Sequence, residues 1–134
     1  MSIEPGLKAE ITITVQESDT ARFSAGEGFP PVLSTPRLIG YLERTAHQAL
    51  LPHLKDNQGS VGSCVNVRHL AATPVGMQVR FCAELMEVDG RRLRFKVEAW
   101  DEVEKIAEGE HERFMIDRSR FDERLAEKTL RIRK

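Results

Sequence analysis

The sequence predicts an α+β domain in which an antiparallel sheet packs against one long amphipathic helix. Three observations lead to this expectation. Apolar residues recur at helical spacing from Leu38 to Leu50, and alternating, strand-like patterns follow them up to the C-terminal tail. The pair Asp89-Gly90 stands between two of these alternating runs, which is typical of a tight hairpin. Together they favour one helix covering one face of an antiparallel sheet.

The N-terminal part of the chain predicts a strand, a long loop and the start of the helix. Residues 9–15 alternate β-branched and polar side chains, as a first strand does. Residues 16–31 are polar and rich in glycine and proline, so we expect a loop or a short irregular helix. Long loops in small domains are more often functional than decorative. Thr35 suits a helix N-cap and Pro36 the first helical position.

Four strands are expected after the helix. The first covers residues 61–72, with Val61 and His69 assigned to the face that meets the helix, and the last covers residues 106–116. Residues 118–128 indicate a charged surface helix or a frayed tail. The outer face of the sheet also carries apolar residues, namely Leu70, Met86, Val88, Trp100, Phe114 and Ile116. Such exposed patches usually bind a partner, and a homodimer is the simplest one.

Composition limits the class of protein. The chain has 134 residues, of which 40% are hydrophobic and 31% charged, so we expect a single domain over residues 1–134 with a core at about 9–117 and a tail at 118–134. The net charge of -1 and the aromatic share of 6% argue against nucleic acid or an anionic membrane as partner. No run reaches membrane-spanning length. Two cysteines without an export signal favour free thiols in the cytoplasm.

Four residues are candidates for chemistry, and each also has an ordinary explanation. Glu43 lies at the rim of the helical stripe, either as a shielded carboxylate or as a solvated one paired with His47. His69 is either a catalyst or a satisfied core histidine, and Thr35 is explained by capping alone. Gly62 either lets a backbone N–H approach a bound carbonyl or marks a bulge. Their convergence on one interior region favours a site.

The same residues stand in motifs that resemble the hotdog-fold acyl-CoA thioesterases, most closely the fluoroacetyl-CoA thioesterase branch. The resemblance covers about residues 11–128 and is strongest in four segments: Ser34-Thr35-Pro36 with Glu43 eight residues after the threonine, 69–76 (HLAATPVG), 89–93 (DGRRL) and 109–113 (GEHER). It implies a hotdog fold, one long helix wrapped by a five-stranded antiparallel sheet. It also implies a catalytic set of Thr35, Glu43 and His69, and a homodimer, or a tetramer, with active sites at the subunit interface.

The expected activity is hydrolysis of a short- or medium-chain acyl-CoA. Glu43 would attack the thioester carbonyl or activate water, and His69 would move the proton. Thr35 would orient the thioester or assist Glu43. The Gly62 N–H would bind the oxyanion. Phe29 falls where the family has a lid aromatic, but the loop and helix are otherwise less aromatic than in the fluoroacetyl-specific enzyme, so the fluorinated substrate is not carried over.

Coenzyme A enters this prediction as part of the substrate, with no cofactor and no metal. Arg113 is the best candidate for a phosphate contact, because it lies within a resembling motif and shares a strand face with His111. Glu43 and His47 are too few to form a zinc site. Two alternatives stay open. One is a hotdog hydratase or dehydratase, for which no matching aspartate is found, and the other is a non-catalytic acyl-CoA-binding module.

Overall fold

The computed structural model describes residues 2–132 and contains five strands, three α-helices and two short 3-10 helices. Their order along the chain matches the predicted one, with small shifts at the ends. The elements are β1 (Lys8–Thr14), η1 (Glu17–Asp19), α1 (Ala21–Ala25), α2 (Thr35–Leu50), η2 (Leu51–His53), β2 (Gln58–His69), β3 (Gln78–Asp89), β4 (Arg92–Asp101), β5 (Lys105–Asp117) and α3 (Arg118–Ile132).

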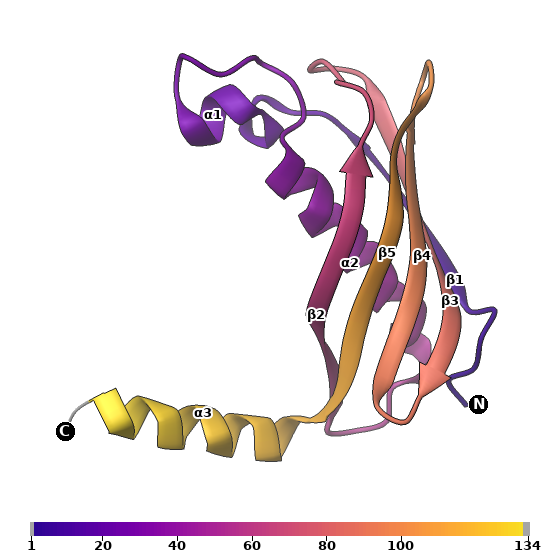
Figure 1. The fold of residues 1–134 in the computed structure, drawn as a ribbon, viewed down its shortest axis with the longest axis vertical. Helices are drawn as coiled ribbons and strands as arrows, with labels where there is room; N and C mark the ends of the chain where they lie inside the picture. Colours follow the sequence, from indigo (N-terminus) through magenta and orange to yellow (C-terminus); the bar gives the residue numbers. More distant parts are fainter. Residues whose placement is uncertain (1, 133–134) are drawn as a thin grey trace.

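The five strands form one antiparallel sheet in the order β1-β3-β4-β5-β2 (Figure 1). Helix α2 lies across one face of this sheet, which confirms the predicted α+β arrangement. The β3–β4 hairpin turns at Gly90-Arg91, one residue later than the predicted Asp89-Gly90 pair, because Asp89 still pairs with Arg92. Gly90 adopts a positive φ of 61°, which a glycine tolerates without strain.

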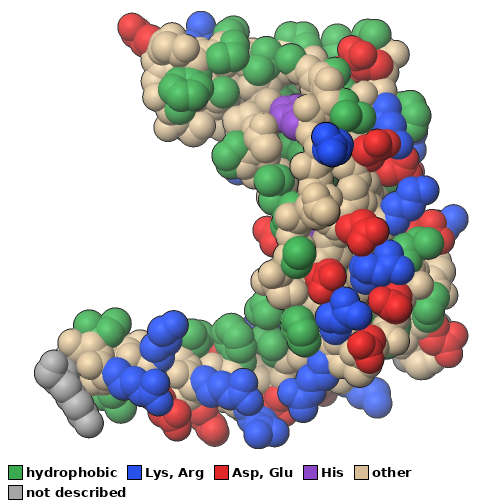
Figure 2. Space-filling model, viewed as in Figure 1, with side chains coloured by type: hydrophobic (Ala, Val, Ile, Leu, Met, Phe, Trp, Pro, Cys, Tyr) green, Lys and Arg blue, Asp and Glu red, His purple; other side chains and the backbone are tan. Residues whose placement is uncertain are grey.

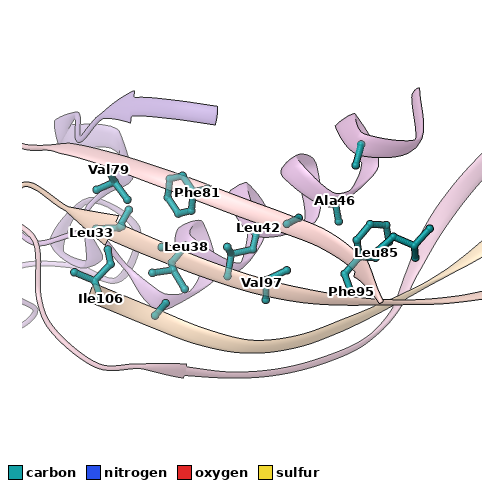
Figure 3. Packing of buried hydrophobic residues seen from close by; sticks show 14 of the residues in the cluster. Leu33, Leu38, Leu42, Ala46, Val79, Phe81, Leu85, Phe95, Val97 and Ile106 are labelled. Carbon is teal, nitrogen blue, oxygen red and sulfur yellow. The ribbon is translucent and has the colours of Figure 1, made fainter. Parts of the chain in front are cut away.

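The hydrophobic core lies between α2 and the inner face of the sheet (Figure 3). Every third or fourth residue of α2 is buried, and the alternate residues of β3, β4 and β5 meet them. This is the spacing at which a helix and a strand each present one face. The residues at the centre of this contact include Leu38, Leu42, Ala46, Phe81, Leu85, Phe95, Val97 and Ile106. The core fixes α2 against the sheet and so determines which of its residues face β2.

Strand β2 contains a bulge that corrects one sequence-based assignment. The pairing with β5 runs Gly62 opposite Arg113 and then Cys64 opposite Glu112, so Ser63 is the extra residue. An extra residue shifts the alternation of faces by one. Val61 therefore lies on the outer face beside Phe114, and not on the inner face predicted for it. The prediction failed because a strict alternation was carried through a segment of small residues that gives no sign of the bulge.

Two segments project from the sheet on the side where β2 is the edge strand (Figure 1). One is the lid segment, which we define as residues 16–33 and which includes η1 and α1. The other is α3, which buries none of its residues. Figure 2 shows the C-shaped outline that results, with several hydrophobic side chains along the edge of α3 that faces the hollow and most of its charged side chains, of both signs, along the opposite edge.

The outer face of the sheet keeps the apolar character predicted for it, since Leu70, Trp100 and Phe114 are 49%, 37% and 40% exposed. Within residues 2–132, no helix combines the length and the apolar character needed to span a membrane.

Candidate active site

Helix α2 begins at Thr35, and the residue that caps it is Ser34. The Ser34 backbone is extended, and its side-chain oxygen accepts a hydrogen bond from the Arg37 N–H at 3.2 Å. The sequence suggested Thr35 for this role, and that assignment is wrong by one residue. The consequence matters for the site, because the Thr35 hydroxyl is not needed for capping. It lies 2.8 Å from Nδ1 of His69 instead.

His69 is the last residue of β2, and its imidazole is half-buried between the sheet and the start of α2. Burial lowers the pKa of His69 below its ordinary value, and the nearby Ala71 backbone only partly opposes this shift. Its Nε2 atom is buried and has no hydrogen-bond partner within residues 2–132. A neutral histidine with one nitrogen held by a hydroxyl and the other free can exchange a proton with a bound molecule at neutral pH.

Glu43 lies eight residues further along α2, about 12 Å from Thr35 along the helix axis at 1.5 Å per residue. Its side chain is 41% exposed and lies against the backbone of Gly62 in β2. A Cβ built at Gly62 would overlap Oε1 of Glu43. Only a glycine leaves room for the carboxylate here. Of the two sequence-based explanations of Gly62, the bulge is confirmed, and the approach of its N–H to a bound carbonyl stays a prediction. Gly62 flanks the bulge, and it lets a side chain approach its backbone.

A polar cluster that is partly buried adjoins the Glu43 carboxylate. We call it the Arg113 cluster and define it as His47, Ser60, His111 and Arg113. The Arg113 guanidinium is 7% exposed and lies 4.0 Å from Oε1 of Glu43. It donates hydrogen bonds to Oγ of Ser60 at 2.8 Å and to the Ser60 carbonyl at 3.0 Å. Oγ of Ser60 also lies 2.7 Å from Nδ1 of His47. The cluster therefore holds one positive charge beneath the carboxylate.

The electrostatics of the cluster follow from its burial. Burial lowers the pKa of Arg113, and the Glu43 carboxylate opposes this shift, so the guanidinium stays charged. Burial and the Arg113 charge lower the pKa of His47, which is neutral at pH 7 as a result. Sequence reasoning missed Ser60 and gave Arg113 a different role. The sharing of one face by His111 and Arg113 was the available signal, but their partners come from another strand.

Phe29 lies in the lid segment, and the structure does not bring it to the other candidates. Its side chain is 51% exposed, between α1 and the extended residues that precede α2. Two isolated bridges, Thr20 with Leu33 and Val32 with Pro74, connect the lid segment at its base. Its aromatic side chain is thus displayed at the surface, on the same side of the sheet as the edge of β2.

Asp19 fixes the lid segment to α2, and sequence reasoning did not find it. Its carboxylate is buried and accepts hydrogen bonds from the Gln16 N–H, the Arg37 guanidinium and the Tyr41 hydroxyl at 2.8–3.0 Å. Burial alone would raise the pKa of Asp19, but these donors outweigh it and lower that pKa. The ionised carboxylate of Asp19 therefore fixes the position of the lid segment relative to α2.

The geometry thus divides the candidates into two groups within one chain, Thr35 with His69 at one end of α2 and Glu43 with Gly62 and Arg113 further along it. Within residues 2–132, no group of His, Cys, Asp and Glu side chains is arranged to hold a metal ion. The chemistry available is that of a carboxylate, a neutral imidazole and a hydroxyl beside an exposed strand edge. Such groups serve nucleophilic or acid–base reactions at a carbonyl.

Comparison with known proteins shows the family to which the chain belongs. A sequence profile described as FlK, fluoroacetyl-CoA-specific thioesterase, matches residues 15–119. The fluoroacetyl-CoA thioesterase of Streptantibioticus cattleyicolor is 41% identical over 101 residues, which are 75% of this chain and 73% of that protein.

Solved structures give the same relationship. A structure of the fluoroacetyl-CoA thioesterase FlK has a TM-score of 0.89 and 33% identity, covering 96% of this chain and 98% of the other. A thioesterase superfamily member from Thermus thermophilus has a TM-score of 0.89 and 28% identity, covering 98% and 96%. A hot-dog-like protein from Thermanaerovibrio acidaminovorans, 24% identical with a TM-score of 0.85 over 92% and 91%, shares the fold. The chain has the hotdog fold and belongs to the FlK family of fluoroacetyl-CoA-specific thioesterases.

Proposed function

We propose that this protein is an acyl-CoA thioesterase, a hydrolase that cleaves the thioester bond of a short- or medium-chain acyl-CoA. The observation that carries the proposal is the carboxylate of Glu43, held against the bare backbone of Gly62 with the Arg113 charge beneath it. Membership of the FlK family supports it, because the characterised relative is named for fluoroacetyl-CoA. A solved structure of a variant of FlK, 34% identical to this chain, is in complex with acetyl-CoA, an unfluorinated acyl thioester.

In the proposed reaction, the elements of water add across the C–S bond and yield a carboxylic acid and the coenzyme A thiol. Glu43 attacks the carbonyl carbon to form an anhydride, or takes a proton from the attacking water. The Gly62 N–H donates to the developing oxyanion. As the C–S bond breaks, the thiolate receives a proton through His69, whose Nδ1 is fixed by the Thr35 hydroxyl. A thiolate is a good leaving group, so the rate depends only weakly on this final protonation.

The surroundings of Arg113 lead us to propose a role for it other than the phosphate contact expected from the sequence. A guanidinium that is 7% exposed and donates to Ser60 has little surface left for a coenzyme A phosphate. We assign it to the support of the Glu43 carboxylate. The substrate itself would extend past Phe29, whose exposed ring could cover an acyl chain in the closed site.

We also propose that the active protein is a homodimer in which each site takes residues from both chains. In one chain, the helix separates Thr35 from Glu43 by about 12 Å, which is too far for both to act on one thioester carbonyl. The edge of β2 is exposed from Gly62 to Asn66. Antiparallel pairing of this edge with a second copy, centred between Val65 and Asn66, would bring His69 of one chain opposite Gly62 of the other. Thr35 and His69 would then face the partner's Glu43.

The activity is tested by thiol release from a panel of acyl-CoAs with wild-type protein and the Glu43→Gln and Glu43→Ala variants. We expect turnover of short or medium chains, reduced at least about a hundredfold in both variants. An enoyl-CoA is included to detect water addition without thiol release, which would indicate a hydratase. Tight acyl-CoA binding without any turnover by the folded wild type would indicate a binding module and refute the thioesterase.

The shared site is tested by mixing inactive variants and allowing the subunits to exchange. A mixed dimer of Glu43→Gln and His69→Gln chains has one intact site, so random exchange should restore about a quarter of wild-type activity. Thr35→Val mixed with His69→Gln is the matched control, because both changes fall in the same half of a site and no activity should be gained. Mixed dimers that form, as seen by native mass spectrometry, without any gain from the first pair would refute the shared site.

A cytoplasmic location is part of the same proposal. Cys64, which is exposed, and Cys82, which is half-buried, are both free thiols. Unpaired accessible thiols are typical of reducing compartments. Cell fractionation tests this location. Detection of the protein outside the cytosolic fraction would contradict a cytoplasmic location.

A further inference from the structure

His111 lies at the middle of β5 and is 1% exposed, yet it has polar partners on both ring nitrogens. Nδ1 lies 2.9 Å from the carbonyl oxygen of Cys64, and Nε2 lies 3.1 Å from Nη1 of Arg113. A carbonyl can only accept a hydrogen bond and a guanidinium can only donate one. These partners leave a single arrangement, in which Nδ1 carries the proton and Nε2 accepts from Arg113.

The two hydrogen bonds of His111 connect it to the groups that are proposed to act on the thioester, namely the Gly62 backbone and Glu43. Cys64 follows the bulged Ser63, so a hydrogen bond to its carbonyl fixes the path of β2 directly after the bulge, two residues beyond Gly62. The His111 ring also lies beneath Gly62, with Cε1 3.2 Å from the point where a Cβ would stand. On its other side, the ring holds Nη1 of Arg113, which is the atom 4.0 Å from Glu43.

We propose that His111 is a positioning residue that, as a neutral Nδ1–H imidazole, sets the Gly62 backbone and the Arg113 guanidinium against Glu43 at the same time. The inference rests on the proposed thioesterase function and deepens it. His111 touches neither the thioester nor water in this scheme. It acts through two other groups, the oxyanion donor and the charge beneath the carboxylate, which must keep a fixed separation for the carbonyl to fit between them.

Burial, together with the charge of Arg113, lowers the pKa of His111 and keeps the ring neutral. On β5 it faces Arg113, and Glu112, the next residue, lies on the opposite face. From α2 the charge of Glu43 acts on it, β2 offers the Cys64 carbonyl, and Phe95 of β4 contributes an uncharged ring 6.4 Å away. Burial lowers the pKa of His111 and the Arg113 charge lowers it further, against the opposing effects of the Cys64 carbonyl and the two glutamates. Protonation would remove the acceptor that Arg113 uses and place a second positive charge beside it.

The first test uses the unmodified protein. Long-range ¹H–¹⁵N NMR of the histidine rings should show one imidazole with a protonated Nδ1 and a bare Nε2, assigned to His111 by its loss in a His111 variant or by its contact with Phe95. This tautomer should persist below pH 6.5, where an ordinary histidine becomes charged. A charged His111 ring at pH 7, or the opposite tautomer, would overturn the proposal. This result does not depend on whether the protein cleaves any thioester.

The second test separates the two contacts. His111→Asn keeps an amide N–H near the Nδ1 position, and His111→Gln keeps an oxygen near the Nε2 position. Each retains one of the two contacts, so we expect each to lower kcat by about 10- to 100-fold with KM changed much less. His53→Gln, in η2 and outside the Arg113 cluster, is the matched control and should leave kcat unchanged.

Either variant with wild-type kcat would overturn the proposal, as would an equal loss in the control. A purely structural role would lower the thermal stability and the amount of active enzyme, with kcat per active site unchanged. Active sites are therefore counted by acyl-CoA binding in the same samples. If the wild-type protein releases no thiol, the proposed function fails, and the NMR result still decides the state of His111.

Discussion

A missing side chain decides where the Glu43 carboxylate can lie. At Gly62 a Cβ would overlap Oε1 of Glu43, whereas at Gly59, three residues earlier in the same strand, a Cβ would meet its neighbours at 3.5 Å or more. The separation of 3.5 Å at Gly59 is an ordinary van der Waals contact. The two glycines of β2 therefore differ sharply in what an added methyl group would do, which makes them a natural pair for an experiment.

We predict that Gly62→Ala lowers kcat/KM by at least about a hundredfold, because a displacement of the carboxylate by about 1 Å can cost that much in rate. Gly59→Ala should stay within a few-fold of wild type. The measurement is steady-state thiol release, with circular dichroism to establish that both variants are folded. Equal activity of the two variants would show that Glu43 is not held by the Gly62 backbone during catalysis.

At the level of residues, the sequence pointed to candidate catalytic groups, whose roles stay predictions, and missed the residues that contact them. Thr35, Glu43 and His69 are recognisable because their types and spacing match a family pattern. Ser60, His111 and Asp19 are not recognisable in this way, because each is a common polar residue whose role depends on a partner far away in the chain. His111 pairs with Val65 across the sheet, and a single sequence does not reveal such a neighbour.

At the level of elements, the periodic parts of the chain were predictable and the interruptions were not. The bounds of α2 follow from its apolar stripe and from the Ser-Thr-Pro start, yet the choice between Ser34 and Thr35 as the cap needed the actual hydrogen bond. The bulge at Ser63 was hidden because small residues on both sides fit either face. Both errors amount to a single residue, and both fall at the site.

The lid segment depends on one buried charge, and this gives a pH-dependent prediction. We expect Asp19→Asn to lower the free energy of unfolding by about 1–3 kcal/mol at pH 7, because the donors from Gln16, Arg37 and Tyr41 lose a charged acceptor. Since the pKa of Asp19 is lowered in the folded state, this contribution is complete above the unfolded pKa of about 3.9 and is lost as the pH falls through the lower, folded value.

Urea unfolding of both proteins between pH 7 and pH 3 checks this prediction. The stability difference between wild type and Asp19→Asn should be constant down to about pH 5 and should shrink below pH 4. Glu27→Gln, an exposed change within the same lid segment, is the matched control and should have no effect of this size. A difference that grows as the pH falls would contradict the assignment of the anchor to the ionised carboxylate.

At the level of the whole molecule, the C-shaped outline leaves apolar side chains exposed that no other part of the same chain covers within residues 2–132. The edge of β2 lies between the lid segment and α3, and the apolar edge of α3 faces the hollow (Figure 2). Leu125, Leu130 and Ile132 of this helix are 49%, 60% and 80% exposed. Apolar surface of this kind is usually covered in the functional assembly, and a second copy paired along β2 would enter the same hollow.

We therefore predict that a chain ending at Asp117 dimerises at least about tenfold more weakly, which corresponds to a loss of about 1.4 kcal/mol. The stability of the single protomer should change little, because α3 buries none of its own residues. Sedimentation velocity over a concentration series measures the first quantity, and urea unfolding measures the second. An unchanged dimer would show that α3 serves another purpose, and an unfolded protomer would show that the helix supports β5.

The separation of Thr35, at the start of α2, from Glu43, near its middle, also has a consequence for how much enzyme a cell must make. If each site needs two chains, then well below the dissociation constant the number of working sites falls with the square of the chain concentration. Diluting the protein twofold would leave about a quarter of its activity in that range. The same dilution would release protomers whose β2 edge is no longer covered by a second copy, so the dimer would protect an edge that can otherwise pair with other strands.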